Sequence, residues 1–300
     1  MSPSLILPNT ATLVFSRNRP AQLDLLLRSI SVNAPKLANP IHVLYAATDK
    51  LYERGYAITR NLHRNVRFWR EIDFRVDTLR LLDAMQADTV MCMTDDSVFY
   101  RPWKAKGAYT SPPAPAKILH ENPRVLCVSL RLSPKTTYCY SLDCQQPAPT
   151  FTRTSDVTTV SARDWLQWYW RTSVADFNYP GSLDAHVFRH DQFKALLTSW
   201  ADAFQPPEFM NPNEMEDVLA RACIRQKLPF MACYPQSFVV TIPANIVTTT
   251  HENRAMNLPA TDPRFLNERF VEGGRLSLKS VDSRKVNAAH CEFPLNWEKK

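Results

Sequence analysis

The first half of the chain alternates short apolar runs with longer amphipathic segments, and this alternation limits the folds open to it. The apolar runs at 12–16, 41–47, 65–69 and 89–94 have the length and composition of strands. The segments between them carry apolar residues at helical spacing, such as Leu23, Leu26, Leu27 and Ile30 after Pro20. Strands that alternate with helices build a sheet covered by helices, so the sequence predicts an α/β fold.

The strand at 89–94 ends on two adjacent carboxylates, Asp95 and Asp96. Ligands of open α/β sheets bind beyond the carboxyl ends of the strands, which favours a site at this position. Carboxylates are the hard oxygen ligands that Mg²⁺ or Mn²⁺ prefers, and such ions commonly bridge to phosphates. A pair of turn aspartates making local hydrogen bonds is the alternative. We expect a metal-bound phosphate here.

Two common nucleotide-binding classes lack their motifs in this chain. The turn after the first strand reads FSRNRP, and the whole chain has five glycines, which disfavours a nicotinamide or flavin enzyme. No G-x-x-x-x-G-K-[ST] motif is present, which excludes a P-loop nucleotidase.

Composition constrains the partners and the cellular environment of the protein but not its reaction. The formal net charge of +7 suits an anionic partner, although the arginines of 60–80 alternate with acidic residues as on a solvated face. Seven cysteines, with Cys139 and Cys144 lacking a second pair, read as reduced thiols and leave zinc disfavoured. We expect no signal peptide, and no membrane-spanning helix because Pro243 interrupts the longest charge-free segment near the C-terminal third. We therefore expect a cytoplasmic protein.

Two segments carry a resemblance to a known family. TLVFSRNRPAQLDLLLRSI resembles the first strand, turn and helix of GT-A glycosyltransferases, and MCMTDDSVFYRP is similar to their Asp-x-Asp region. The resemblance covers most of residues 10–255 and implies a Rossmann-like mixed sheet flanked by helices. It implies a catalytic domain at 1–255, with a donor half at about 10–120 and an acceptor half at about 121–255. Residues 256–300 read as an irregular tail or lid.

The resemblance also implies a donor site. Asp95 and Asp96 would hold Mn²⁺ or Mg²⁺ and the diphosphate, with Ser97 standing where many members have a third acidic residue. Asp49 would contact the base or ribose, and Arg17 would lie near the diphosphate or nucleoside. His251 would complete the metal shell, unless it is a surface or capping histidine, and Arg254 would reach the same phosphates.

The general base is expected in NPNEMEDVLARACI, residues 211–224, which places Glu214, Glu216 and Asp217 in the first turn of a helix. Acidic residues also suit the helix dipole there. The Glu-Asp pair resembles the acidic motif that supplies the base in inverting GT-A enzymes, so we expect Asp217, and next Glu216, to deprotonate the acceptor hydroxyl.

On the acceptor side, YPGSLDAHVFRHDQF resembles the segment in which Asp184 and His186 would contact the acceptor sugar, with packing as the alternative for His186. RDWLQWYW predicts a helix with Trp165, Trp168 and Tyr169 on one face. Core packing is the default for such aromatics, and stacking of Trp168 on a sugar is the functional alternative.

The sequence thus predicts an enzyme that moves a sugar from a nucleotide-diphosphate donor to a hydroxyl of a glycan or glycolipid, with inversion. A retaining enzyme of the same fold would share the metal motif. A sugar nucleotidyltransferase usually has a glycine-rich segment after the first strand, which FSRNRP is not. A non-catalytic anion or nucleic-acid binding module would explain the charge but not the carboxylates, and no nucleic-acid motif supports it.

Overall fold

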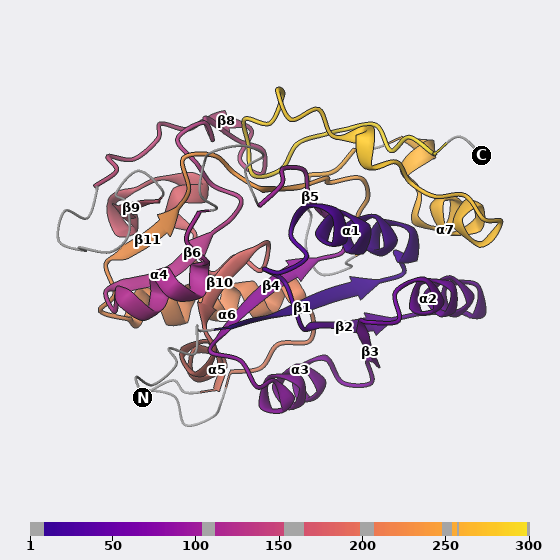
Figure 1. Cartoon of the computed structure of the whole chain (residues 1–300), viewed down its shortest axis with the longest axis horizontal. Helices are drawn as coiled ribbons and strands as arrows, with labels where there is room; N and C mark the ends of the chain where they lie inside the picture. Colours follow the sequence, from indigo (N-terminus) through magenta and orange to yellow (C-terminus); the bar gives the residue numbers. More distant parts are fainter. Residues whose placement is uncertain are drawn as a thin grey trace, which may run out of the picture.

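A computed structural model of the chain describes residues 9–103, 112–152, 165–198, 207–247, 254–256 and 258–298. In this part of the chain an eight-stranded sheet has the order β3-β2-β1-β4-β10-β6-β11-β9 (Figure 1). β1 pairs in parallel with β2 and β4, whereas β10 runs antiparallel to both β4 and β6. The strands of this sheet are Thr10–Arg17 (β1), Ile41–Ala46 (β2), Arg67–Arg70 (β3), Thr89–Thr94 (β4), Val125–Ser129 (β6), Leu166–Tyr169 (β9), His186–Arg189 (β10) and Phe230–Cys233 (β11).

Helices cover both faces of the sheet (Figure 1). Buried residues of α3, α5 and α6 share one core cluster, and those of α1, α2 and α4 share another. This arrangement confirms the predicted α/β class with a mixed sheet flanked by helices. The helices are Pro20–Asn33 (α1), Lys50–Leu62 (α2), Phe74–Ala84 (α3), Pro115–Glu121 (α4), His190–Thr198 (α5), Pro212–Arg225 (α6) and Pro263–Val271 (α7).

The unit formed by β1 and α1 follows from its residues. Leu13 faces one core cluster and Val14 the other, as the two-residue period of a strand requires. Pro20 starts α1, whose predicted apolar face is buried. Between them Asn18 has a φ of +55°, and its side chain both donates to and accepts from Thr48. The turn after β1 is therefore fixed against the end of β2.

Aspartates set the starts of the next two helices. Asp49 accepts hydrogen bonds from the backbone of Leu51 and Tyr52 and caps α2, and Asp73 caps α3 through the N–H of Val76. α3 consequently begins at Phe74. β4 coincides with the predicted strand at 89–94.

The predicted helix at 165–170 is wrong. Residues Leu166–Tyr169 form β9, in which Trp168 pairs with Met231 of β11. Aromatic side chains favour strands because they pack on a pleated surface, and this run is too short for its spacing to distinguish a strand from a helix.

The predicted irregular tail also contains regular structure. Asp262 caps α7 through the N–H of Phe265, and Leu266 and Phe270 of α7 are buried with Ala21 of α1 in a third core cluster. This C-terminal segment also reaches β12 (Val239–Thr241), where Thr241 forms a parallel bridge with His290. β12 pairs with β5 (Ser97–Phe99) in a separate two-stranded sheet.

None of the helices in the described residues combines the length and the apolar content that crossing a bilayer requires.

Candidate active site

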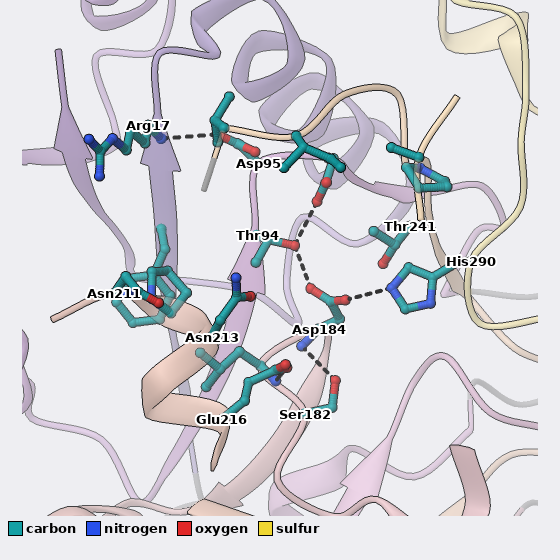
Figure 2. Close-up of a pocket in the computed structure, with 18 of the residues that line it drawn as sticks. Arg17, Thr94, Asp95, Ser182, Asp184, Asn211, Asn213, Glu216, Thr241 and His290 are labelled. Carbon is teal, nitrogen blue, oxygen red and sulfur yellow. Dashed lines mark hydrogen bonds and ion pairs between the residues drawn. The ribbon is translucent and has the colours of Figure 1, made fainter. Parts of the chain in front are cut away.

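A cavity of about 330 Å³ lies over the carboxyl ends of β1 and β4, among the described residues. The turn after β4, the segment just before β10 and the first turn of α6 all contribute to its wall (Figure 2). Its charged lining consists of six carboxylates and four guanidiniums. They are Glu71, Asp95, Asp96, Asp176, Asp184 and Glu216, with Arg17, Arg19, Arg131 and Arg254.

Arg19 binds both carboxylates that follow β4. Its Nη1 donates to Asp95 Oδ1 at 3.0 Å and to Asp96 Oδ2 at 3.1 Å, while its Nε donates to Asn245 Oδ1 at 2.7 Å. Burial raises the pKa of Asp95 to about 6, with Asp96 as a further raising charge, despite the opposing charge of Arg19. The Arg19 guanidinium therefore does not fully offset the cost of burying a charged Asp95.

Thr94 links the carboxylate pair to the other side of the cavity (Figure 2). Its hydroxyl lies 2.7 Å from Asp96 Oδ1 and is also hydrogen-bonded to Asp184 Oδ1. A hydroxyl has one hydrogen to donate, so only one of these carboxylates receives it at a time.

Asp184 is the most strongly compensated carboxylate of the cavity. Arg131 Nη1 donates to its Oδ2 at 2.8 Å, and His290 Nε2 lies 3.4 Å from the same oxygen. Burial would raise the pKa of Asp184, but the Arg131 guanidinium, together with His290 and Thr94, holds it well below its usual range. Asp184 therefore stays ionised and organises its neighbours.

Glu216 projects from α6 into the cavity. The N–H of Leu183 donates to its Oε1 at 2.6 Å. Burial, and next the nearby charge of Asp184, raise the pKa of Glu216 to about 7. A carboxylate with this pKa is suited to taking a proton near neutral pH.

The three acidic residues predicted in the first turn of this helix differ in position. Asn211 caps α6, and the carboxylate of Glu214 accepts from the Asn211 side chain and the Met210 N–H. Asp217 is exposed and does not line the cavity, unlike Glu216. Of the predicted Glu-Asp pair, the cavity lining therefore includes Glu216 and not Asp217.

Two predicted cationic residues line the cavity. Arg17 is exposed, and its backbone N–H donates to Asp95 Oδ2 at 3.3 Å. Arg254 donates to the carbonyl oxygen of Tyr140 at 3.1 Å, stacks over its ring at 4.3 Å and pairs with Asp143.

Besides Asp217, four predicted site residues do not line the cavity. Asp49 is at the N-terminus of α2 and pairs with Arg264 at 3.4 Å. Ser97 is buried in β5, with its Oγ 3.4 Å from Thr241 Oγ1 and 3.5 Å from Thr94 Oγ1. The other two, His186 and Trp168, are core residues.

Burial lowers the pKa of His186 to about 3, and its Nδ1 lies 3.3 Å from the Pro180 oxygen. Trp168 has no exposed surface, and its Nε1 donates to the Phe177 oxygen at 2.9 Å. His186 and Trp168 are therefore core packing residues, which was one of the two interpretations of each. Stacking of Trp168 on a sugar is excluded because its ring is enclosed.

His251, the remaining predicted metal ligand, lies outside the described residues. Within the described part of the chain, no group of three or more histidine, cysteine, aspartate or glutamate side chains is arranged as a metal centre. The donor chemistry still fits a hard cation shared with a ligand's phosphates, because carboxylates outnumber guanidiniums around the cavity.

Sequence reasoning missed Arg19, Thr94, Arg131 and His290. Arg19 stands two residues after Arg17 in the same turn, so its position offered a signal. Arg131 and His290 meet at 3.2 Å although 159 residues separate them, and no local pattern marks such a pair.

No family model matches the chain, and no curated protein matches it. Among solved structures, it is similar to a crystal structure of a mycobacterial protein over 87% of this chain and 71% of that chain, with 14% identity and a TM-score of 0.44. It is similar to S. aureus TarS over 78% of this chain and only 37% of that chain, with 11% identity and a TM-score of 0.46.

A third similar structure is glucosyl-3-phosphoglycerate synthase from Mycobacterium tuberculosis in complex with Mn²⁺, UDP-glucose and phosphoglyceric acid. The match covers 74% of this chain and 67% of that chain, with 16% identity and a TM-score of 0.39. Since likenesses at this level do not transfer an activity, function is inferred from the cavity's own side chains.

Proposed function

We propose that this chain is a glycosyltransferase that takes a sugar from a nucleotide-diphosphate donor and attaches it to a carbohydrate hydroxyl, with Glu216 as the general base. One observation carries the proposal. The cavity at the carboxyl ends of the parallel strands contains both an aspartate pair, Asp95 and Asp96, and a carboxylate of near-neutral pKa, Glu216.

The base is assigned to Glu216 because it combines position and basicity. An acceptor hydroxyl is a poor nucleophile until a positioned group removes its proton, and a base works best when its pKa lies near the working pH. Glu216 lines the cavity and has a pKa of about 7, whereas Asp217 is outside it. The bond from Leu183 fixes one carboxylate oxygen of Glu216.

The donor diphosphate is assigned to the turn after β4. A diphosphate would be repelled by a cavity in which carboxylates are in excess, so its binding there requires an added cation. Asp95 and Asp96 would hold Mn²⁺ or Mg²⁺, and Asp96 is the more accessible, with 14% of its side chain exposed against 3% for Asp95. The ion would supply stabilisation of the charge that develops on the departing diphosphate.

Arg17 and Arg254 line the same cavity and would contribute charge toward the phosphates. Arg19 remains a fixed cation at the base of the site, because its guanidinium is held by Asp95, Asp96 and Asn245.

Inversion is supported by the difference between the carboxylates of Glu216 and Asp184. Direct displacement with inversion needs one base, while a retaining double displacement needs a second carboxylate as nucleophile. Asp184 is engaged by Arg131, His290 and Thr94, and its lowered pKa makes it a weak nucleophile. Asp184 is instead the predicted acceptor-side residue that lines the cavity.

The rival functions fit this cavity less well. A nucleic-acid or anion binding module would present an excess of cations, and the lining has an excess of carboxylates. A sugar nucleotidyltransferase would be expected to have glycine in the turn after β1, where Asn18 and Arg19 stand.

The test is a thermal-shift panel of UDP, GDP, dTDP and CMP sugars, each with and without Mn²⁺. A ligand that binds the native state raises its melting temperature. We expect one nucleotide class to raise it by a few degrees, only with Mn²⁺, and Asp96→Asn to abolish the shift.

Asp49→Asn is the matched control, because asparagine caps a helix as well as aspartate does and residue 49 is outside the cavity. Absence of a shift with every donor, for a folded protein, would contradict the proposal. Salt-sensitive binding of nucleic acid would favour the binding module.

A further inference from the structure

Two cysteines face each other across a short hairpin at the edge of the cavity. β7 (Tyr138–Cys139) and β8 (Cys144–Gln145) are antiparallel, and Cys139 is the register partner of Cys144. Side chains directly opposite in such a pair lie on the same face. Their Cα atoms are typically about 4.5–5.5 Å apart, which lies within the roughly 4.4–6.8 Å that a disulfide spans. A disulfide between them is therefore compatible with the register of the hairpin.

The two thiols differ in access. All seven cysteines are free, and all are among the described residues. Cys144 is the exposed one, while Cys139 is 2% exposed and the others are buried. Burial, followed by the charge of Asp176, raises the pKa of Cys139. An oxidant in solution therefore meets Cys144 first, and Cys139 lies beneath it as the second thiol.

The loop between the cysteines belongs to the cavity. Tyr140 and Ser141 line it, and the loop closes with Asp143 at a φ of +50°. The reduced loop is held by polar contacts, among them Tyr140 Oη to Glu292 at 2.6 Å and Arg254 with Asp143 at 2.9 Å. A covalent bond at its base would fix this part of the cavity wall.

We propose that Cys139 and Cys144 form a reversible modification site, at which an oxidant of the peroxide class closes a disulfide across the base of the cavity loop. The Cys144 thiol attacks the peroxide O–O bond and becomes a sulfenic acid, releasing one water. The Cys139 thiol then attacks that sulfur, and the second water leaves. Two thiols and one hydrogen peroxide thus give one disulfide and two waters.

The test treats the full reduced chain with limiting hydrogen peroxide, blocks the remaining thiols and measures the intact mass and the linked peptides. We expect a loss of two hydrogens, a single crosslink between Cys139 and Cys144, and reversal by dithiothreitol. Amide exchange in residues 140–143 should slow on oxidation, since the crosslink restricts their opening.

Two variants separate the steps. Cys144→Ser, at an exposed position, should fold normally and form no crosslink. Cys139→Ser should accumulate a sulfenic acid at Cys144, which dimedone traps. If Cys139→Ser, a substitution at a buried position, impairs folding, the Cys144→Ser variant alone provides the test. Sulfenic or sulfinic acid on Cys144 of the wild type without a crosslink, or a disulfide between two chains, would overturn the proposal.

Discussion

The backbone N–H of Leu183 donates a 2.6 Å hydrogen bond to Oε1 of Glu216, which joins the segment before β10 to α6. A hydrogen bond to a carboxylate normally favours its charged form, yet burial and Asp184 together raise the pKa of Glu216 to about 7. The carboxylate is thus both fixed in place and kept basic, which are the two properties that a general base requires.

The first prediction concerns the pH dependence of the rate. Glu216 must be ionised to accept a proton, so kcat/KM should fall about tenfold per unit as the pH drops below about 7. The measurement is initial rate against pH at low donor and acceptor concentration. An acid limb centred near 4.5, the ordinary value for a glutamate, would show that another group sets the rate.

The same pKa makes a prediction about stability. Because the folded state binds this proton more tightly than the unfolded state, the wild type should lose stability as the pH rises from about 4.5 through about 7. The loss is on the order of 3–4 kcal/mol, at roughly 1.4 kcal/mol per pKa unit. Glu216→Gln lacks the titrating group, so its denaturant midpoint should exceed that of the wild type at pH 8 and not at pH 5. Parallel pH profiles for the two proteins would count against the raised pKa.

Arg19 is predicted to be needed for folding as well as for the site. Arg19→Met leaves Asp95 and Asp96 without their guanidinium, and removal of one partner from a buried ion pair typically costs about 3–5 kcal/mol. Arg19→Lys keeps the charge and should cost less. Urea unfolding with and without Mn²⁺ checks this, and Mn²⁺ should restore part of the loss in Arg19→Met. A loss below about 1 kcal/mol for Arg19→Met would contradict the role assigned to this pair.

Trp168 is predicted to act through packing. Trp168→Ala should lower the free energy of unfolding by about 3–5 kcal/mol, because a fully buried ring is removed. Trp168→Phe should be milder and should leave the acceptor KM unchanged. A raised acceptor KM in a stable Trp168→Phe variant would instead place the ring in the acceptor site.

The parts of the fold that sequence predicted are those with a long or unambiguous pattern. The leucine face of α1 and the apolar run of β4 each match one element only. The four residues of β9 are too few for their period to distinguish a strand from a helix, and the short apolar face of α7 packs against α1, a partner distant in the sequence.

The residues around the cavity also divide into those that a local sequence pattern marks and those that it does not. Asp95, Asp96 and Glu216 follow from strand ends and helix starts, which sequence marks. The order of the two base candidates was also readable. Met215, Val218 and Leu219 define the buried face of α6, and at 100° per residue Asp217 falls opposite to it. Arg131 and His290 depend on tertiary contacts between distant segments, which no single stretch of sequence specifies.

The central claim is tested most directly by comparing transfer rates of Glu216→Gln and Asp217→Asn with the donor that the thermal-shift panel selects. The two residues are neighbours on one helix, so each variant controls for the other. Glu216→Gln should lower kcat by about 10²–10⁴-fold while keeping the donor-dependent thermal shift, and Asp217→Asn should stay close to the wild type. Full turnover in Glu216→Gln, or its loss in Asp217→Asn alone, would contradict the account.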